Sequence, residues 1–242
     1  MRRQLSIVVL AAAGVTALSA CGMAFASTHE DDAALKGGIT AVHIEGIGSG
    51  RVTLRGGASE ADMSVHRKIK YRGDRPEGPT HRIENGVLTL GDCGSRCSVS
   101  YTVDLPAGVA VSGGTSNGAI DLSRVGKVDV STESGSIRLD DISGTVKART
   151  SNGEIEGHGL KGGGTDVETS NGEITLVPAK AQNIRAKASN GEVTVTVPAG
   201  PYRVSARTGS GDRNVSVPDD PSAEHRLDLT TDNGDITAKP AG

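Results

Sequence analysis

The segment TSNGEI at 150–155 is repeated at 169–174, and variants of it flank both copies. The variants are TSNGAI at 115–120, TESGSI at 132–137, ASNGEV at 188–193, TGSGDR at 208–213 and TDNGDI at 231–236. The residues that mark these turns are Asn117, Gly118, Gly135, Asn152, Gly153, Asn171, Gly172, Asn190, Gly191, Gly211, Asn233 and Gly234. Successive turn glycines are 17, 18, 19, 19, 20 and 23 residues apart, at or just below the spacing of solenoids and other arrays. The sequence therefore predicts a repeat architecture.

Apolar and polar residues alternate on both sides of each turn, as in VDVST at 128–132 and SIRL at 136–139. A period of two is typical of strands that bury one face. The inward positions hold small or β-branched residues, for example Val128, Val130 and Ile137. Because the chain has no Trp and one Phe, these residues predict a thin core between two close sheets.

Two strand arrangements fit this pattern. Each Asn-Gly or Ser-Gly could close a local hairpin with a type I′ turn, or equivalent strands could stack in register about 4.8 Å apart. The residues six positions before the turn glycine favour stacking, because their charges alternate from repeat to repeat: Asp129, Lys147, Asp166 and Arg185. We therefore predict an all-β fold, a parallel β-solenoid with coils of about 17–20 residues. Parallel crossovers are nearly always right-handed, so we expect that hand.

The N-terminus has the features of a bacterial export signal. Arg2 and Arg3 precede an apolar stretch that ends in LSAC at 18–21, which matches the lipobox of bacterial lipoproteins. We predict that residues 1–20 are a signal peptide and that Cys21 is lipidated, anchoring the protein extracytoplasmically in the cell membrane. The alternatives are a plain secretory signal or an uncleaved anchor, for which the apolar stretch is short.

The cysteine count agrees with export. Of the three cysteines, Cys21 would carry lipid, which leaves Cys93 and Cys97 as a pair in an oxidising compartment. We expect a disulfide between them. A metal site is a poor alternative, because two cysteines without a second pair or a histidine motif leave coordination incomplete.

Outside the repeats we expect a flexible tether at 21–38 and an irregular β half at 39–112, followed by regular repeats at 113–242, with 39–242 as one continuous domain. Gly50 and Gly86 fit the turn frame but are 36 residues apart, so an excursion between them is expected to cap the first coil. It contains RGD at 72–74, a match too short to indicate integrin binding. Arg213 replaces Ile or Val after its turn, which predicts a bulge or a local shift near 211–215.

The lipoprotein signal followed by tandem TSNGEI and ETSNGEI units resembles the bacterial putative adhesin family of β-strand-repeat proteins, a domain of unknown function of cell-envelope proteins. The resemblance covers about residues 39–240. It implies a β-solenoid in the envelope and supplies no catalytic residues. Some members resemble accessory proteins of envelope stress signalling.

These features predict a lipid-anchored, non-catalytic module for surface display, adhesion or binding. The alternative is an accessory or sensor partner in envelope stress signalling. A carbohydrate-active β-helix enzyme is a weaker third hypothesis, because sugars usually stack on aromatic rings and the domain has only Tyr71, Tyr101 and Tyr202. The expected partners are the membrane, through the lipid, and an envelope protein or cell-wall glycan. Removing the two signal arginines leaves 24 basic against 29 acidic residues, a net charge of −5, which disfavours nucleic acid.

Acidic residues follow five turn glycines directly: Glu154, Glu173, Glu192, Asp212 and Asp235. In a stack they would form one row of like charges, which repel unless screened. The simpler hypothesis is a solvated corner. The alternative is a cation or partner row that meets Ca²⁺ or a basic patch; no other cofactor is expected.

Overall fold

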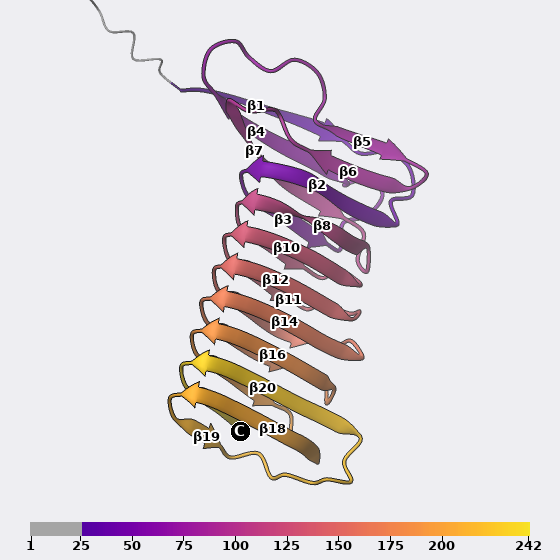
Figure 1. Ribbon diagram of the computed structural model, residues 1–242. Coiled ribbons are helices and arrows are strands. Elements are labelled where there is room, and N and C mark those ends of the chain that lie inside the picture. The colour runs from indigo at the N-terminus through magenta and orange to yellow at the C-terminus, as the bar shows by residue number, and fades with distance from the viewer. Residues whose placement is uncertain (1–25) are drawn as a thin grey trace, which may run out of the picture.

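The computed structural model describes residues 26–242, which form two long β-sheets lying face to face (Figure 1). Sheet A has 11 strands, in the spatial order β1 (Ser27–Ala34), β4 (Ser64–Tyr71), β7 (Cys97–Leu105), β3 (Val52–Gly56), β9 (Ile120–Ser123), β11 (Ile137–Asp140), β13 (Ile155–Leu160), β15 (Ile174–Pro178), β17 (Val193–Val197), β21 (Ile236–Pro240) and β19 (Arg213–Val215). Sheet B has 10 strands, in the order β18 (Tyr202–Ser210), β20 (His225–Asn233), β16 (Asn183–Asn190), β14 (Gly164–Asn171), β12 (Val146–Asn152), β10 (Val128–Ser134), β8 (Ala110–Asn117), β2 (Ala41–Ser49), β6 (Val87–Gly91) and β5 (His81–Glu84).

The strands on either side of each repeated turn lie in different sheets, so the turns are corners and local hairpins are ruled out there. Equivalent strands pair in parallel, and partner residues such as Val111 and Val128, or Val128 and Val146, are 17 to 19 positions apart along β8, β10, β12, β14 and β16. The all-β, mostly parallel and solenoid-like architecture expected from the sequence is therefore confirmed.

The predicted inward residues form the core. Val128, Val130, Ile137 and Leu139 are each at most 2% exposed, and one apolar cluster runs through the stack. Tyr101 and Tyr202 are the largest fully buried side chains among residues 26–242. Small and β-branched side chains fill the narrow space between the sheets, which explains how the chain folds with almost no aromatic residues.

Buried threonines tie neighbouring repeats together at the corner. The hydroxyls of Thr132, Thr150 and Thr169 donate hydrogen bonds of 3.0–3.1 Å to the carbonyl oxygens of Gly118, Gly135 and Gly153, the turn glycines of the preceding repeats. Ala188 occupies the same inward position in the next repeat and is fully buried. This repeat therefore has no hydroxyl to offer Gly172.

We expect Ala188→Thr to stabilise the protein by about 1 kcal/mol, because it supplies the missing hydrogen bond at a position where neighbouring repeats accommodate threonine. The measurement is the free energy of unfolding in urea. Ala188→Val is the matched control, since valine has the same shape without the hydroxyl. Equal stability of the two variants would contradict the hydrogen-bond explanation.

The outward charges on sheet B lie in the predicted register. Asp166 pairs with Lys147 on one side and with Arg185 on the other, and Asp129 Oδ2 lies 3.8 Å from Lys147 Nζ. Two positions further along, Glu168 contacts both Arg149 at 3.5 Å and Lys187 at 3.1 Å. The pKa of Glu168 is lowered, mainly by its hydrogen bond with Lys187. These exposed pairs favour correct register more than they add stability.

We expect Lys147→Glu to destabilise the fold by a few tenths to about 1 kcal/mol, because it places a third acid between Asp129 and Asp166. Adding Asp166→Lys should recover part of the loss. Chemical denaturation of the single and double variants measures the coupling, and strictly additive effects would contradict the ladder.

Contrary to the expectation from the sequence, the last two repeats do not stack in the order in which they follow one another in the chain. β20 and β21 lie between the β16/β17 pair and the β18/β19 pair, so the final repeat in sequence is the second to last in space. The segment 216–224 carries the chain back. The insertion places Asp228 beside Arg185, where chain order would have placed Ser205, so the charge alternation continues. The N-terminal half has the same arrangement, with β2 and β3 between the β6/β7 and β8/β9 pairs.

Three further expectations for irregular segments were wrong. Residues 27–34 of the predicted tether form β1, which pairs antiparallel with β4 because its alternate residues face the sheet. Gly86 is not a corner: Asn85 and Gly86 have φ values of 51° and 76° and close the antiparallel β5–β6 hairpin. Arg213 causes no bulge, since it pairs in register with Ile236 and is exposed on the last strand of sheet A.

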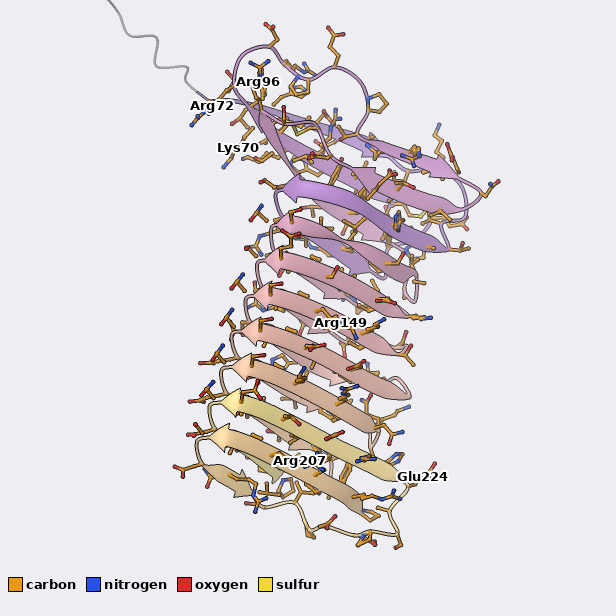
Figure 2. All side chains as sticks on the ribbon, viewed as in Figure 1. Lys70, Arg72, Arg96, Arg149, Arg207 and Glu224 are labelled. Atoms are coloured by element: carbon orange, nitrogen blue, oxygen red, sulfur yellow. A yellow bond between two sulfur atoms is a disulfide. The ribbon has the colours of Figure 1, made fainter. Side chains whose placement is uncertain are left out.

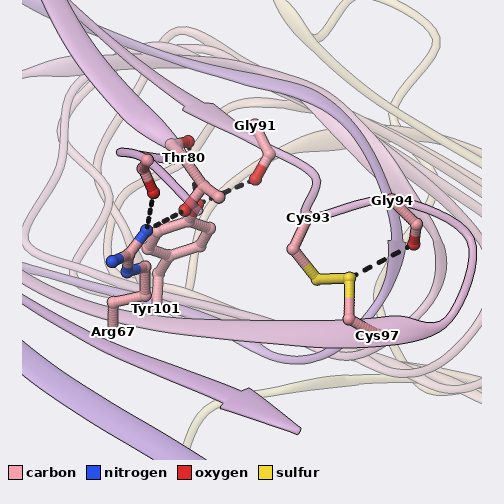
Figure 3. Close-up of a disulfide and its surroundings, with 8 residues drawn as sticks. Arg67, Thr80, Gly91, Cys93, Gly94, Cys97 and Tyr101 are labelled. Atoms are coloured by element: carbon pink, nitrogen blue, oxygen red, sulfur yellow. Dashed lines mark hydrogen bonds between the residues drawn. A yellow bond between two sulfur atoms is a disulfide. The ribbon is translucent and has the colours of Figure 1, made fainter. Parts of the chain in front are cut away.

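The excursion between Gly50 and Gly86 covers one end of the stack (Figure 1). Arg67, whose side chain is 9% exposed, reaches from β4 to Asp31 on β1, with Nη2 2.6 Å from Oδ2, and also donates to Gly78 O and Thr80 Oγ1. The Tyr101 hydroxyl lies 2.9 Å from Thr80 O (Figure 3). Burial raises the pKa of Tyr101 to about 12, so this hydroxyl stays a donor. These contacts hold the loop 72–80 against the first strands.

Candidate functional site

The corner that holds the turn glycines is a continuous structural row. Asn171, Asn190 and Asn233 each donate a 3.0 Å hydrogen bond from Nδ2 to the Oδ1 atom of the preceding asparagine, starting at Asn152. The turn glycines lie close together, and a Cβ on Gly172 would be 2.0 Å from Gly153 O. The repeated Asn and Gly residues therefore serve packing of the backbone at this corner.

The acidic row lies beside this corner of turn glycines. The backbone hydrogen bonds that its carbonyl oxygens accept give the order of its members: Glu154, Glu173, Glu192, Asp235, Asp212. Chain order would have exchanged the last two. The pKa of Glu154 is raised, first by burial and then by the neighbouring Glu156 and Glu173. No group of three or more His, Cys, Asp or Glu residues that could hold a metal ion occurs within 26–242. Calcium binding by this row stays a prediction.

We expect the combined change of Glu154, Glu173 and Glu192 to Gln to raise the melting temperature at neutral pH in metal-free buffer, because it removes like-charge repulsion. A raised carboxyl pKa in the folded state means that protonation relieves the penalty as the pH falls. The gain should therefore disappear in acid. A calcium-dependent shift in the unmodified protein, absent from the variant, would identify a cation row; no gain at neutral pH would contradict the repulsion.

The two cysteines are joined as expected. Cys93 and Cys97 form a disulfide with their Cα atoms 6.0 Å apart, in the neighbourhood of Tyr101 and Thr80 (Figure 3). It closes the short loop before β7. Cys21 lies outside the described residues, and no helix within 26–242 could cross a bilayer.

A groove of about 610 Å³ opens where the sheet B strands begin, near the C-terminal end of the stack. It is lined by three arginines and three acids: Asp166, Arg185, Arg203, Glu224, Arg226 and Asp228. Its lining residues come from β12, β14, β16, β20 and β18 and from the segments just before them, and Figure 2 labels one of them, Glu224. Five strands thus build one surface.

Two of the three arginines of this groove, Arg203 and Arg226, lie beside each other, whereas Arg185 lies between Asp166 and Asp228. Arg203 and Arg226 are direct partners in the parallel register of β18 and β20, an arrangement in which like charges repel. Within 26–242, neither these two nor Arg185 has an acidic group within ion-pair distance. Arg203 Nη2 donates only to Ala223 O, at 3.2 Å. Exposed guanidinium groups close together suit carboxylate, sulfate or phosphate groups.

Sequence reasoning missed this groove. Arg203 and Arg226 each lie eight residues before their turn glycines, Gly211 and Gly234, so the repeat frame already makes them neighbours, and this shared position was the available signal. Only the placement of β20 beside β16 required the tertiary structure.

Two solved structures resemble the described fold at low sequence identity. One is described as a putative cell adhesion protein from Clostridium sporogenes, with 13% identity, a TM-score of 0.43, and coverage of 89% of this chain and 100% of the other. Another is described as a putative adhesin from Bacteroides fragilis, with 12% identity, a TM-score of 0.45, and coverage of 89% and 97%. No curated protein matched this chain. The family model Toastrack DUF4097 matches residues 107–239, more than half of the chain. The chain therefore belongs to the Toastrack DUF4097 family.

Proposed function

We propose that this protein is a lipid-anchored, non-catalytic binding module on the extracytoplasmic side of the cell membrane, built as a right-handed β-solenoid with one coil per repeat. The anchor is the lipid on Cys21. The module presents its arginine groove to an anionic envelope partner, either a protein or a cell-wall glycan.

The observation that carries the proposal is the distance between the point where the chain enters the fold and the groove. The chain enters the fold at β1, on the first edge of sheet A (Figure 1). The residues that line the groove lie on the strands toward the opposite end of sheet B. Eleven strands at the standard spacing give a stack about 50 Å long. A protein tethered at β1 would therefore hold the groove away from the membrane. The Cys93–Cys97 disulfide fits an oxidising compartment outside the cytoplasm.

The anchor is tested with Cys21→Ala, which should leave unprocessed or released protein in cell fractionation, because only a cysteine thiol accepts the lipid. If the Cys21→Ala protein stays bound to the membrane at its normal mature size, the lipoprotein assignment is overturned.

The groove is tested by proximity labelling from the intact lipoprotein on cells, with Arg226→Glu as the variant. The new carboxylate would neutralise Arg203 and should remove the partner without lowering the melting temperature. Arg207→Glu is the matched control, an exposed arginine on β18 outside the groove (Figure 2). Unchanged labelling by Arg226→Glu would contradict this site, and the identity of the labelled partner distinguishes a glycan from a signalling protein.

A further inference from the structure

A second basic surface lies where the chain enters the fold. A hollow of about 460 Å³ is lined by Ala26, Lys70, Tyr71, Arg72, Arg96 and several serines, and by no acidic residue. Lys70 and Arg72 come from the end of β4 and the residue after it, and Arg96 precedes β7. Figure 2 shows the three side chains gathered at the N-terminal end, beside the start of β1. We call Lys70, Arg72 and Arg96 the basic patch.

The charges of this patch are unneutralised, in contrast to those of neighbouring residues. Along β4, Arg67 pairs with Asp31 and Lys68 pairs with Glu30 at 2.6 Å. Lys70 instead lies between Thr28 and Ser98 in the register, and within 26–242 no acid lies within ion-pair distance of the basic patch.

The backbone keeps the patch together. The amide of Arg72 donates to Arg96 O at 3.2 Å, so two arginines are held side by side. Repulsion among such cations is relieved when a multivalent anion lies on them.

The patch is also next to the predicted anchor. Ser27 pairs with Tyr71, and Ala26 itself lines the hollow. Ala26 lies five positions after Cys21, a distance of at most about 18 Å when fully extended. A lipid on Cys21 therefore places the hollow within reach of the membrane surface.

We propose that the basic patch docks onto the headgroups of anionic phospholipids in the membrane that holds the anchor. This inference rests on the lipid anchor proposed above. Arginine and serine groups match the phosphate chemistry of the headgroup, and tyrosine favours the membrane interface, where Tyr71 would lie.

The remaining charges indicate how the stack is oriented. The acidic row begins at Glu154 and continues to Asp212 at the far end, whereas the corresponding corner position nearer the patch holds Arg51, which is paired with Asp121. An anionic membrane repels the acidic row and attracts the basic patch. The stack therefore stands with its far end, and the groove at that end, directed away from the lipid.

The test uses residues 22–242, which lack the lipid site but contain every described residue, in co-sedimentation with vesicles. Vesicles of phosphatidylglycerol and phosphatidylcholine should bind the protein, and vesicles of phosphatidylcholine alone should not. Binding should weaken with salt. Changing Lys70, Arg72 and Arg96 to Gln should reduce partitioning by roughly fivefold per charge removed.

The charge-matched control changes Lys127, Lys180 and Arg207 to Gln, exposed residues outside the patch, and should bind as the unmodified protein does. Equal loss in both triple variants would mean that only net charge matters and would overturn the patch. No binding to the anionic vesicles, or a melting shift with inorganic phosphate alone, would also overturn it. These results do not depend on Cys21→Ala in cells, so a failed patch and a failed anchor are distinguishable.

Discussion

Gly172→Ala should destabilise the protein by about 3 kcal/mol or more, the largest effect we expect from adding a single methyl group. The added Cβ would lie 2.0 Å from Gly153 O and 2.6 Å from Gly153 C, and the φ of Gly172 is +146°. Both contacts are with backbone atoms of the neighbouring repeat, so no side-chain rotation can relieve them. The corner would have to open, which would break the asparagine and threonine hydrogen bonds on either side.

The measurement is the free energy of unfolding in urea. Gly163→Ala is the matched control, because a Cβ there meets nothing within 4 Å. It should change stability by no more than about 0.5 kcal/mol. If both variants unfold at the same urea concentration, close approach of the corner glycines does not limit the stack.

Asp31→Ala should cost about 3 kcal/mol, because it leaves the Arg67 guanidinium largely buried without its counter-charge. Its remaining acceptors, Gly78 O and Thr80 Oγ1, are neutral. The loss should appear first as loosening of β1 and the loop 72–80. Hydrogen exchange of the β1 and β4 amides, together with chemical denaturation, would detect it.

The ion pair between Arg67 and Asp31 also makes the stability of the fold depend on pH. Arg67, through its hydrogen bond, holds the pKa of Asp31 below its ordinary value of 3.8. A lowered carboxyl pKa contributes stability that is present above the unfolded-state pKa and is lost as the pH falls through the folded-state value. The unmodified protein should therefore lose stability below about pH 4, and Asp31→Ala should lack this component.

Asp32→Ala is the control for both measurements, since Asp32 is 78% exposed and pairs with His66 at the surface. Its effect should stay within about 0.5 kcal/mol. An equal effect of the two substitutions would show that burial of Arg67 is not the cause.

The regular half of the fold could be predicted because the residue pattern that specifies each repeat lies within that repeat and its next neighbour. Alternation identified the buried side chains, as for Val128 and Ile137, and the opposite charges of Lys147 and Asp166 identified parallel neighbours. These signals are local or depend on one neighbour. The Cys93–Cys97 pair was predicted on different grounds, from the even number of remaining cysteines and the oxidising compartment, and the structure has this disulfide.

Asn-Gly marks the limit of local prediction. Asn85-Gly86 closes an antiparallel hairpin with positive φ at both residues, whereas Asn171-Gly172 turns a corner between two sheets. The dipeptide permits both conformations. The choice depends on whether the following strand gains more by pairing with the preceding strand or by joining the opposite sheet, and that gain is made only in the assembled core.

The residues of the regular repeats are enough to predict the strand pattern, the inward faces, the parallel register and the repeat length. Only the assembled structure shows which repeat lies beside which at the two ends, that 27–34 joins sheet A, and hence that Asp228 lies beside Arg185 and that the basic patch lies where the chain enters. The physical reason is that strands with the same buried face offer nearly the same hydrogen bonds and contacts to any neighbour. Their order is therefore set by long-range packing and by the reach of the connecting segments, which no local pattern records.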